Sequence, residues 1–347
     1  MLQSTKLGWI LAGEINNFSS KRLVQFRAYS YHCSQLIENE INKNLLRFWE
    51  VAECDSVAKY DDICETHFKE NYTRNEEGQF VVKLPFKKNE KLLGDSKQNA
   101  LKCFEYLERR LSKNSELKQQ YTDFMCEYKE LGHMSLLTDN IDQLSDDNAD
   151  AYYLSHHAVI KTDSLTTRCR VVFNGSASTD SGLSLNDIQY AGPTVQKDLL
   201  AIILNFRKNT YVLNADISKM YRQVIIDKPD RRYQRIFWRN HPSENVQCYE
   251  LNVVTYGLAS SPYLATRCLL QLSLDNEKLY PLASNVIKNC FYVDDLLTGS
   301  DSETELLQIQ KEVSKILKGA GFDLRKYLSN KPELVEQFDV NTSLDDD

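Results

Sequence analysis

The chain has 347 residues, and its 42 lysines and arginines against 49 aspartates and glutamates give a formal net charge of −7. A hydrophobic fraction of 42% with a charged fraction of 26% is typical of a folded globular protein and excludes a disordered chain. The negative net charge argues against a basic coat for nucleic acid over the whole surface, but it leaves room for a local basic cleft.

The N-terminal part of the chain is expected to be mainly helical. Residues 1–20 begin with a short predicted strand and then become polar, like the tail of another domain. Apolar residues recur at helical spacing over residues 36–65 and 92–137, which predicts amphipathic helices. Between them, residues 78–86 alternate as in a strand, whereas residues 138–150 are rich in aspartate and predict an exposed linker.

A different pattern begins after residue 151, where short β-branched and aromatic runs alternate with glycine, asparagine and proline. These runs predict strands, and the two helical segments among them indicate an α+β domain. The predicted strands are residues 158–161, 168–173, 211–216, 234–238 and 248–254, followed by a hairpin over residues 289–298. The predicted fold class is therefore α+β, with a mainly helical N-terminal region.

The cysteines and the hydropathy pattern bear on the compartment. Nine cysteines are scattered along the chain, and no two are spaced as C-x-x-C. This arrangement argues against a disulfide framework or a zinc site and favours a reducing compartment. No apolar run approaches the roughly 18 residues of a membrane span, and no signal peptide opens the chain. We therefore expect a soluble, intracellular protein.

Adjacent carboxylates mark the candidate site. In residues 289–299, two apolar runs flank Asp294 and Asp295, which predicts a hairpin with acids at its tip. A second apolar strand, residues 211–216, also ends in a carboxylate, Asp216. Such hard oxygen ligands could hold two Mg²⁺ ions about 3.5 to 4 Å apart, an arrangement suited to phosphoryl transfer. The alternative for an isolated Asp-Asp pair is an ordinary turn.

The residues Tyr292-Val293-Asp294-Asp295 resemble the YxDD signature of reverse transcriptases. The resemblance implies that Asp216 is the first catalytic aspartate, which acts with Asp294 and Asp295 and shares the metal ions with them. It also implies that Tyr221, five residues after Asp216, is the aromatic gate that rejects the 2′-hydroxyl of a ribonucleotide.

Residues 256–262 are similar to the loop that opens the helix under the incoming base and template in these enzymes. Ser261 is the expected N-cap of that helix, and Pro262 is the expected first helical residue. By resemblance, Tyr256 and Gly257 are nucleotide-binding residues. Retroviral enzymes carry glutamine where Tyr256 stands, so a hydrogen bond to the nucleotide sugar is not implied there.

Residues 158–161 and 169–173 resemble the fingers hairpin, whose basic side chains grip the triphosphate. The resemblance gives this role to Lys161 and Arg170. Arginine suits bidentate contact with phosphate, whereas lysine makes a point-charge contact.

More narrowly, the chain resembles the Pao (BEL) class of long-terminal-repeat retrotransposon polyproteins. The matching words are residues 45–50, 92–96, 107–111, 128–134, 153–159, 184–187, 215–224 and 321–326. The implied domains are a protease-like tail (1–20), a mainly helical spacer (21–137), an acidic linker (138–150), reverse transcriptase fingers and palm (151–335) and an acidic tail (336–347). On this reading the chain is expected to be a fragment of a polyprotein.

The implied activity is that of an RNA-directed DNA polymerase. It uses an RNA or DNA template with a primer, deoxynucleoside triphosphates and two Mg²⁺ ions, with Mn²⁺ as the alternative metal. The implied neighbours are the protease, ribonuclease H and integrase segments of the polyprotein, with no membrane partner, in a cytoplasmic particle. A second hypothesis is a catalytically inert retroelement remnant that keeps the fold as a nucleic-acid-binding module.

Local charge leaves one interpretation open. Between residues 151 and 260, 13 lysines and arginines face 9 aspartates and glutamates, an excess that suits contact with a nucleic-acid backbone. Arg231, Arg232, Arg235 and Arg239 form either a solvated helix face or part of a phosphate track. For the adjacent histidines at 156 and 157 we expect strand or surface roles.

Overall fold

The computed structural model describes residues 2–5, 8–11, 55–138, 140–141, 151–160 and 169–336. The chain divides into two compact units, Met1–Glu53 and Cys54–Asp347. In the first unit, β1 (Leu2–Thr5) and β2 (Gly8–Leu11) form an antiparallel hairpin, and β2 confirms the short predicted strand. All other described elements belong to the second unit.

A four-stranded antiparallel sheet lies at the centre of the second unit's C-terminal half, with the order β12-β13-β8-β14. Its strands are β12 (Phe291–Tyr292), β13 (Asp295–Ser300), β8 (Tyr211–Ile217) and β14 (Leu324–Ser329). The predicted strand and hairpin are thereby confirmed, whereas β14 was not predicted. Side chains of β8 alternate between buried and half-buried positions, as expected for a strand with one face on the core.

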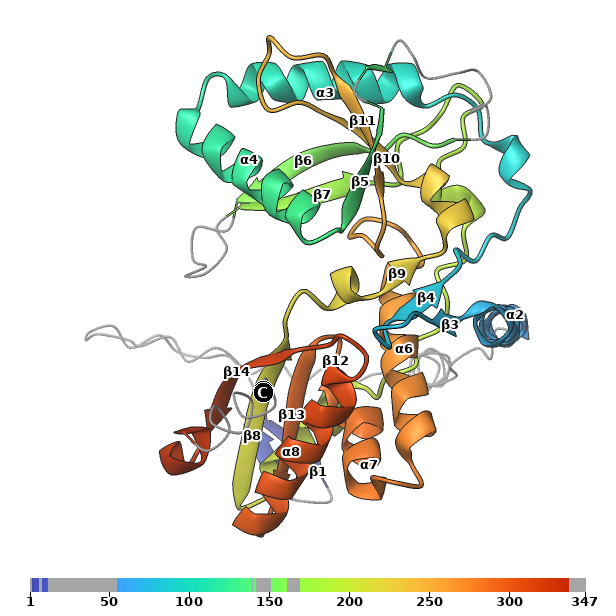
Figure 1. Ribbon diagram of the computed structural model, residues 1–347. Helices are drawn as coiled ribbons and strands as arrows, with labels where there is room; N and C mark the ends of the chain where they lie inside the picture. The colour runs from blue at the N-terminus through green and yellow to red at the C-terminus, as the bar shows by residue number, and fades with distance from the viewer. Residues whose placement is uncertain are drawn as a thin grey trace, which may run out of the picture. The chain divides into compact units, whose positions relative to one another are not determined.

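Helices pack around this sheet, as Figure 1 shows for α8. They are α5 (Leu199–Arg207), α6 (Ser261–Asn276), α7 (Pro281–Asn289) and α8 (Glu303–Lys318). In α6, residues Leu264, Cys268 and Leu272 are buried as predicted. None of the described helices combines the length and the apolar character that a membrane crossing requires.

The start of α6 differs by one residue from the prediction. The N-cap is Ser260, so Ser261 is the first helical residue and Pro262 the second. The reason is that the Ser261 hydroxyl donates a hydrogen bond to the carbonyl oxygen of Thr255 at 2.5 Å, outside the helix, and caps no backbone N–H of α6.

A second group of strands forms the other half of this unit. β10 (Arg235–Trp238), β11 (Gln247–Leu251) and β5 (Met134–Thr138) make an antiparallel sheet, and β6 (Ser155–Ile160) pairs with β7 (Cys169–Asn174). The helices α3 (Lys97–Leu111) and α4 (Ser115–Glu130) pack against these strands and confirm most of the helical region predicted over residues 92–137. The end of that prediction is wrong, because residues 134–137 pair with β11 as part of β5 instead of continuing a helix. Most of β5 belongs to the predicted spacer (21–137), whereas β11 belongs to the predicted fingers and palm region (151–335). Their pairing therefore joins these two parts of the chain in one sheet.

The core of this half is aromatic. Tyr121 stacks on Trp238 with ring centroids 5.2 Å apart, and its hydroxyl lies 2.5 Å from Nδ1 of His156. Nε2 of His156 lies 2.9 Å from the carbonyl oxygen of Phe237. Burial lowers the pKa of His156 to about 4, so the ring is neutral, with Nε2 as donor and Nδ1 as acceptor. His156 therefore has the predicted strand role.

A small sheet connects N-terminal and C-terminal parts of the second unit. It contains β3 (Thr73–Arg74), β4 (Phe80–Val82) and β9 (Ile225–Ile226), and the β4–β9 pair is parallel. β4 is shorter than the strand predicted over residues 78–86. Because the β4–β9 pair is separated by more than 140 residues in sequence, this part of the spacer is held directly beside the segment that follows β8.

Two of the four arginines near residue 235 belong to structural ion pairs. Arg235 is buried and pairs with Glu250 at 2.8 Å, and Arg239 pairs with Glu108 of α3 at 2.7 Å. The solvated helix face is therefore wrong for these two residues, because Arg235 lies in β10 and Arg239 directly follows that strand. The phosphate track is wrong for Arg235, which is buried. Their guanidinium groups are committed to carboxylates, because Arg235 lies in a strand that α3 covers.

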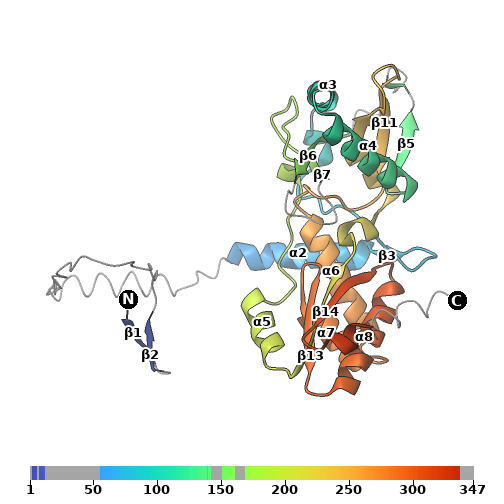
Figure 2. The same cartoon turned by 90° about the vertical axis from the view of Figure 1, so that its left-hand side faces the viewer.

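Helix α2 (Asp55–Asn71) is fixed to α6 by a buried charge, and Figures 1 and 2 both place the two helices side by side. The side chain of Arg267 is 0% exposed and donates two hydrogen bonds of 2.7 Å to the carboxylate of Glu65. These bonds lower the pKa of Glu65 to about 2. The hydrophobic ring of Phe68 packs edge-on to Tyr263 in the same contact.

We predict that Glu65→Gln destabilises the protein by about 3 kcal/mol, because Arg267 then stays buried without a counter-charge. Denaturant unfolding measures the loss. The matched control is Glu105→Gln in α3, whose pairing with Arg109 is exposed and is worth less than about 1 kcal/mol. Equal effects of the two substitutions would contradict the structural role of the buried pair.

The same pair predicts a pH dependence. A carboxyl group whose pKa is lowered by folding stabilises the fold above its unfolded pKa, and this contribution is lost as pH falls through the folded pKa. For Glu65 the loss falls between about pH 4.5 and pH 2. The difference in unfolding free energy between the parent and Glu65→Gln should therefore shrink across this range, and a constant difference would exclude the assigned pKa.

Candidate active site

The first carboxylate is placed by the two-residue period of β8. Ala215 and Ile217 are fully buried, so the intervening Asp216 projects to the other, partly exposed face. In the antiparallel pairing, Asp216 lies directly opposite Asp295 of β13. The structure thus brings together two carboxylates that are 79 positions apart in the sequence.

The third carboxylate lies in the tight turn between β12 and β13. Val293 has a φ of 55°, a conformation that is strained for a β-branched residue. Gln196 holds the turn by accepting from the Val293 N–H at 2.8 Å and donating to its carbonyl oxygen at 3.2 Å. The carbonyl oxygen of Asp294 also accepts a hydrogen bond of 2.9 Å from the backbone N–H of Ile217. Asp294 is therefore fixed beside the end of β8.

The three carboxylates repel one another. Desolvation raises the pKa of Asp294, and the charges of Asp295 and Asp216 raise it further, while Arg170 opposes the shift. Partial desolvation also raises the pKa of Asp295, to which Asp216 adds and which Lys326 opposes. Negative charge at this point is therefore only partly compensated by the protein.

Lys326 is the nearest compensating cation. Its Nζ lies 2.6 Å from Oδ2 of Asp216. Among the described residues, no three His, Cys, Asp or Glu side chains are grouped closely enough to hold a metal ion. The chemistry of the donors nevertheless fits a hard divalent cation, because three carboxylates meet at adjoining strand ends and two of them have raised pKa values.

Two tyrosines lie beside the carboxylates. Tyr221, in the 3₁₀ helix Met220–Gln223, is 9% exposed, and its ring centroid lies 4.6 Å from that of Tyr256. Burial raises the pKa of Tyr221 to about 12, with further contributions from Tyr256 and Asp294. Tyr256 is 45% exposed and covers Tyr221 on the side toward solvent. Both predicted residues are therefore close to the carboxylates.

Gly257 has a backbone role that its sequence position alone could not reveal. Its φ is 105°, and a Cβ at this position would lie 1.7 Å from the carbonyl oxygen of Phe173 in β7. The side chain of Asn186 donates to the Gly257 carbonyl oxygen at 3.0 Å and accepts from the Ala259 N–H at 2.8 Å. A glycine is required because the loop before α6 passes directly against the fingers strand.

Arg170 and Lys161 are the two residues predicted to contact the triphosphate, and the structure describes only the first of them. Arg170 lies exposed on β7, and its side chain makes no hydrogen bond or ion pair with any other described residue. Its charge partly offsets the rise in the pKa of both Asp294 and Tyr256, so Arg170 lies close enough to the carboxylates to act on them and is available to an anion. Lys161 lies outside the described residues.

Sequence reasoning did not identify Lys326 or Gln196. Lys326 lies in a short motif, residues 321–326, that resembles Pao polyproteins, but nothing in that motif indicates an ion pair with Asp216. Gln196 lies in an irregular segment before α5 that carries no signal of its own. Both contacts join positions about 100 residues apart, so only the folded chain reveals them.

Part of the chain is similar to a known protein family. Residues 175–329 match the family model described as reverse transcriptase (RNA-dependent DNA polymerase). The matched part includes the three carboxylates, Tyr221, Tyr256 and Gly257, but it begins after Arg170. This match supports a reverse transcriptase region here, and the mixed helices and sheets agree with its polymerase palm and fingers. No curated protein matches the chain.

We predict that Asp294→Asn stabilises the metal-free protein slightly. Folding raises the pKa of Asp294, so its ionisation lowers stability as pH rises through the folded value. The neutral amide should therefore add about 0.5 kcal/mol at pH 7, a modest gain because solvent screens the partly exposed group. Denaturant unfolding in EDTA measures this change in the free energy of unfolding. The control is Asp123→Asn, which changes an exposed carboxylate of α4. A loss of stability in Asp294→Asn that the control does not show would contradict the repulsion among the carboxylates.

Proposed function

We propose that this chain is the core of an RNA-directed DNA polymerase of a Pao-type retrotransposon polyprotein. The observation that carries the proposal is the position of Asp294 in the hairpin turn, next to the cross-strand pair of Asp216 and Asp295. The family match over residues 175–329 supports a reverse transcriptase activity in general. The short sequence motifs that resemble Pao polyproteins support the narrower assignment to a Pao-type element.

The carboxylates suit phosphoryl transfer because a nucleotide and a primer end both bring negative charge to the site. Asp216, Asp294 and Asp295 would hold two divalent cations, of which Mg²⁺ is the expected one and Mn²⁺ the alternative. When bound, such ions lower the pKa of the primer 3′-hydroxyl and offset the charge of the departing pyrophosphate. The protein then contributes mainly by positioning the reactants.

The remaining residues would select and orient the nucleotide. Arg170 would donate a bidentate pair of hydrogen bonds to phosphate oxygens, with Lys161 as a second cation. The backbone at Gly257 keeps the loop before α6 against β7, which leaves the ring of Tyr256 to face the nucleotide. Tyr221 lies beneath that ring and would limit the space beside C2′ of the sugar.

The partners we propose follow from this activity. They are an RNA or DNA template with its primer, deoxynucleoside triphosphates, and the protease, ribonuclease H and integrase segments of a polyprotein. We further propose an intracellular site of action in a cytoplasmic particle.

Primer extension by the purified chain on an RNA template tests the activity. We predict that Asp294→Asn abolishes extension, because an amide offers one neutral oxygen in place of a shared charge. Asp123→Asn should extend like the parent. Extension by Asp294→Asn at the parental rate would refute the assignment of the carboxylates.

The same preparation separates the polymerase from an inert remnant. An inert binding module would retain template and primer in a filter-binding assay but would not add a nucleotide with either Mg²⁺ or Mn²⁺. Extension that depends on Asp216, Asp294 and Asp295 supports the polymerase, and template binding without any extension supports the remnant.

We predict that Tyr221→Val relaxes sugar selection. A gate acts through a clash that the wrong sugar cannot relieve, so a smaller side chain should increase ribonucleotide incorporation relative to deoxynucleotide incorporation. Single-nucleotide incorporation with matched triphosphates measures the ratio. If Tyr221 is only a core residue, truncation should instead cost about 3 kcal/mol of stability and reduce both incorporations equally.

A further inference from the structure

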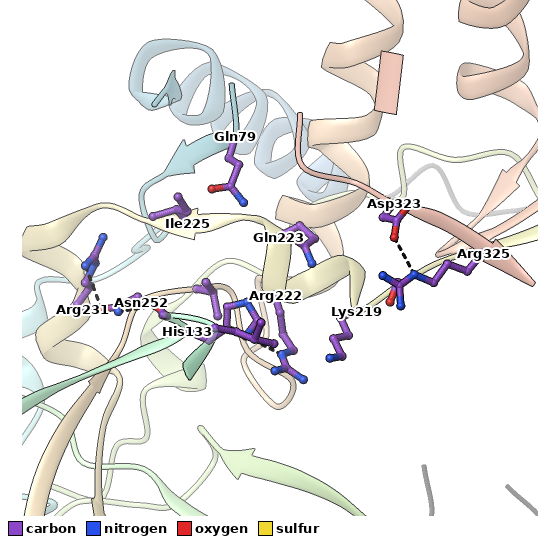
Figure 3. A pocket seen from close by; sticks show the side chains of 14 residues that line it. Gln79, His133, Lys219, Arg222, Gln223, Ile225, Arg231, Asn252, Asp323 and Arg325 are labelled. Carbon is purple, nitrogen blue, oxygen red and sulfur yellow. Dashed lines mark hydrogen bonds and ion pairs between the residues drawn. The ribbon is translucent and has the colours of Figure 1, made fainter. Parts of the chain in front are cut away.

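A cavity lies next to the three carboxylates and differs from them in its chemistry. It has a volume of about 410 Å³, which is within the roughly 300–1,000 Å³ of small-molecule sites. Its lining comes from the loop before β5, the chain that follows β8 as far as Arg231, the end of β11 and the start of β14, and Figure 3 shows the side chains that line it. We call it the basic pocket, defined by His133, Lys219, Arg222, Arg231, Asp323 and Arg325.

The basic pocket has an excess of positive charge. Four cationic side chains line it, Lys219, Arg222, Arg231 and Arg325, against one lining carboxylate, Asp323. One further carboxylate, Glu127 of α4, bonds both Lys219 and Arg222. Two carboxylates thus pair with three of the four cations, in a chain whose net charge is −7. Such a local reversal of charge favours an anionic ligand.

Arg231 is the cation with the least compensation. Its Nε donates to the carbonyl oxygen of Ile226 at 2.9 Å, and its Nη1 donates to Oδ1 of Asn252 at 3.0 Å. Both acceptors are neutral, and Arg231 forms no ion pair within the described part of the chain. Asn252 is itself fixed, because its Nδ2 donates to the Gly132 carbonyl oxygen and to the Ser135 hydroxyl. The guanidinium is therefore held in place without an ion pair, although the negative charges of Glu250 and Asp227 act on it from nearby.

Arg222 and His133 are also fixed in orientation. The side chain of Arg222 is 7% exposed, and its Nε donates to Nδ1 of His133 at 2.9 Å. Burial lowers the pKa of His133 to about 4, and the charges of Arg222 and Lys219 contribute. At neutral pH the ring is therefore uncharged with its proton on Nε2, which adds a hydrogen-bond donor to the lining.

The donors suit phosphate. Guanidinium groups present paired N–H donors that match two phosphate oxygens, and a fixed Arg231 loses little freedom when it binds one. A single phosphate group carries about two negative charges at neutral pH, whereas linked phosphate groups bring more charge and more acceptor oxygens to a pocket lined by four cations. The lining includes neither Arg170, to which the triphosphate contact was assigned, nor any of the three active-site carboxylates.

We propose that the basic pocket is a binding site for a small polyphosphate anion, either free pyrophosphate or the polyphosphate end of a nucleotide. Two lining residues lie close to the active site. Ser218 is two residues beyond Asp216, and Arg325 lies opposite Asp216 in the pairing of β14 with β8. Binding itself does not require the proposed polymerase activity. Only the identification of the ligand as the product of nucleotide addition rests on the proposed function.

Calorimetric titration of the full chain with sodium pyrophosphate, in EDTA and at low salt, tests the proposal. We expect saturable binding that is tighter than that of orthophosphate. Arg231→Gln should weaken it by about tenfold or more, because a charge-assisted contact is lost. Arg325→Gln should also weaken it, and because Arg325 is 63% exposed this variant keeps the fold. Arg109→Gln in α3 is the control and should bind like the parent.

Each outcome of the titration supports or overturns the proposal. Absence of saturable binding by the parent up to about 1 mM, or unchanged binding by both Arg231→Gln and Arg325→Gln, overturns it. Tighter binding of a deoxynucleoside triphosphate, weakened by the same variants, identifies the nucleotide as the source of the polyphosphate; equal or tighter binding of pyrophosphate identifies the free anion. Asp294→Asn should retain binding even though it abolishes extension, so the two proposals fail separately.

Discussion

The antiparallel pairing of β8 with β13 is the constraint on which the site depends. It places Asp216 opposite Asp295, and the pairing continues through buried positions such as Leu296 opposite Ala215. A slip of one residue would exchange the two faces of β8, bury Asp216 and expose Ala215. The cost of burying a carboxylate among apolar side chains fixes this register. The residues that stabilise the sheet therefore also determine where the carboxylates meet.

The fold keeps the three active-site carboxylates close together although they repel one another. Three carboxylates with few compensating cations disfavour the fold, and the turn that carries Asp294 contains a strained residue, Val293. The side chain of Gln196 and the backbone N–H of Ile217 fix this turn from two directions. Such an arrangement is expected where function requires a local conformation that the chain would not adopt by itself.

The sequence predicted the strands and helices of this fold better than the contacts between distant residues. Alternation of apolar residues located β8, β13 and the fingers hairpin to within a few residues, because a half-buried strand must alternate. It did not identify β5 or β14, whose short runs are largely exposed on their own and become strands only through pairing with β11 and β8. Asp294 and Asp295 were found because adjacent acids are unusual in an apolar hairpin, and Asp216 was found because it ends a second apolar strand. The ion pairs of Arg235 and Arg239 and the basic pocket were not found, because they join positions far apart in the sequence.

The irregularity of β14 explains how acidic and basic sites can adjoin. Arg325 lies opposite Asp216, so in a regular strand the next residue, Lys326, would point to the other face of the sheet. The pairing shifts between Arg325 and Leu328, and Lys326 has a φ of 56°, which is rare for a side chain of its kind. This bulge redirects the ammonium group to Asp216, while Arg325 bonds Asp323 at the rim of the basic pocket. A cation that binds Oδ2 of Asp216 would therefore compete with the Lys326 ammonium, one residue away from Arg325 in the lining of the basic pocket.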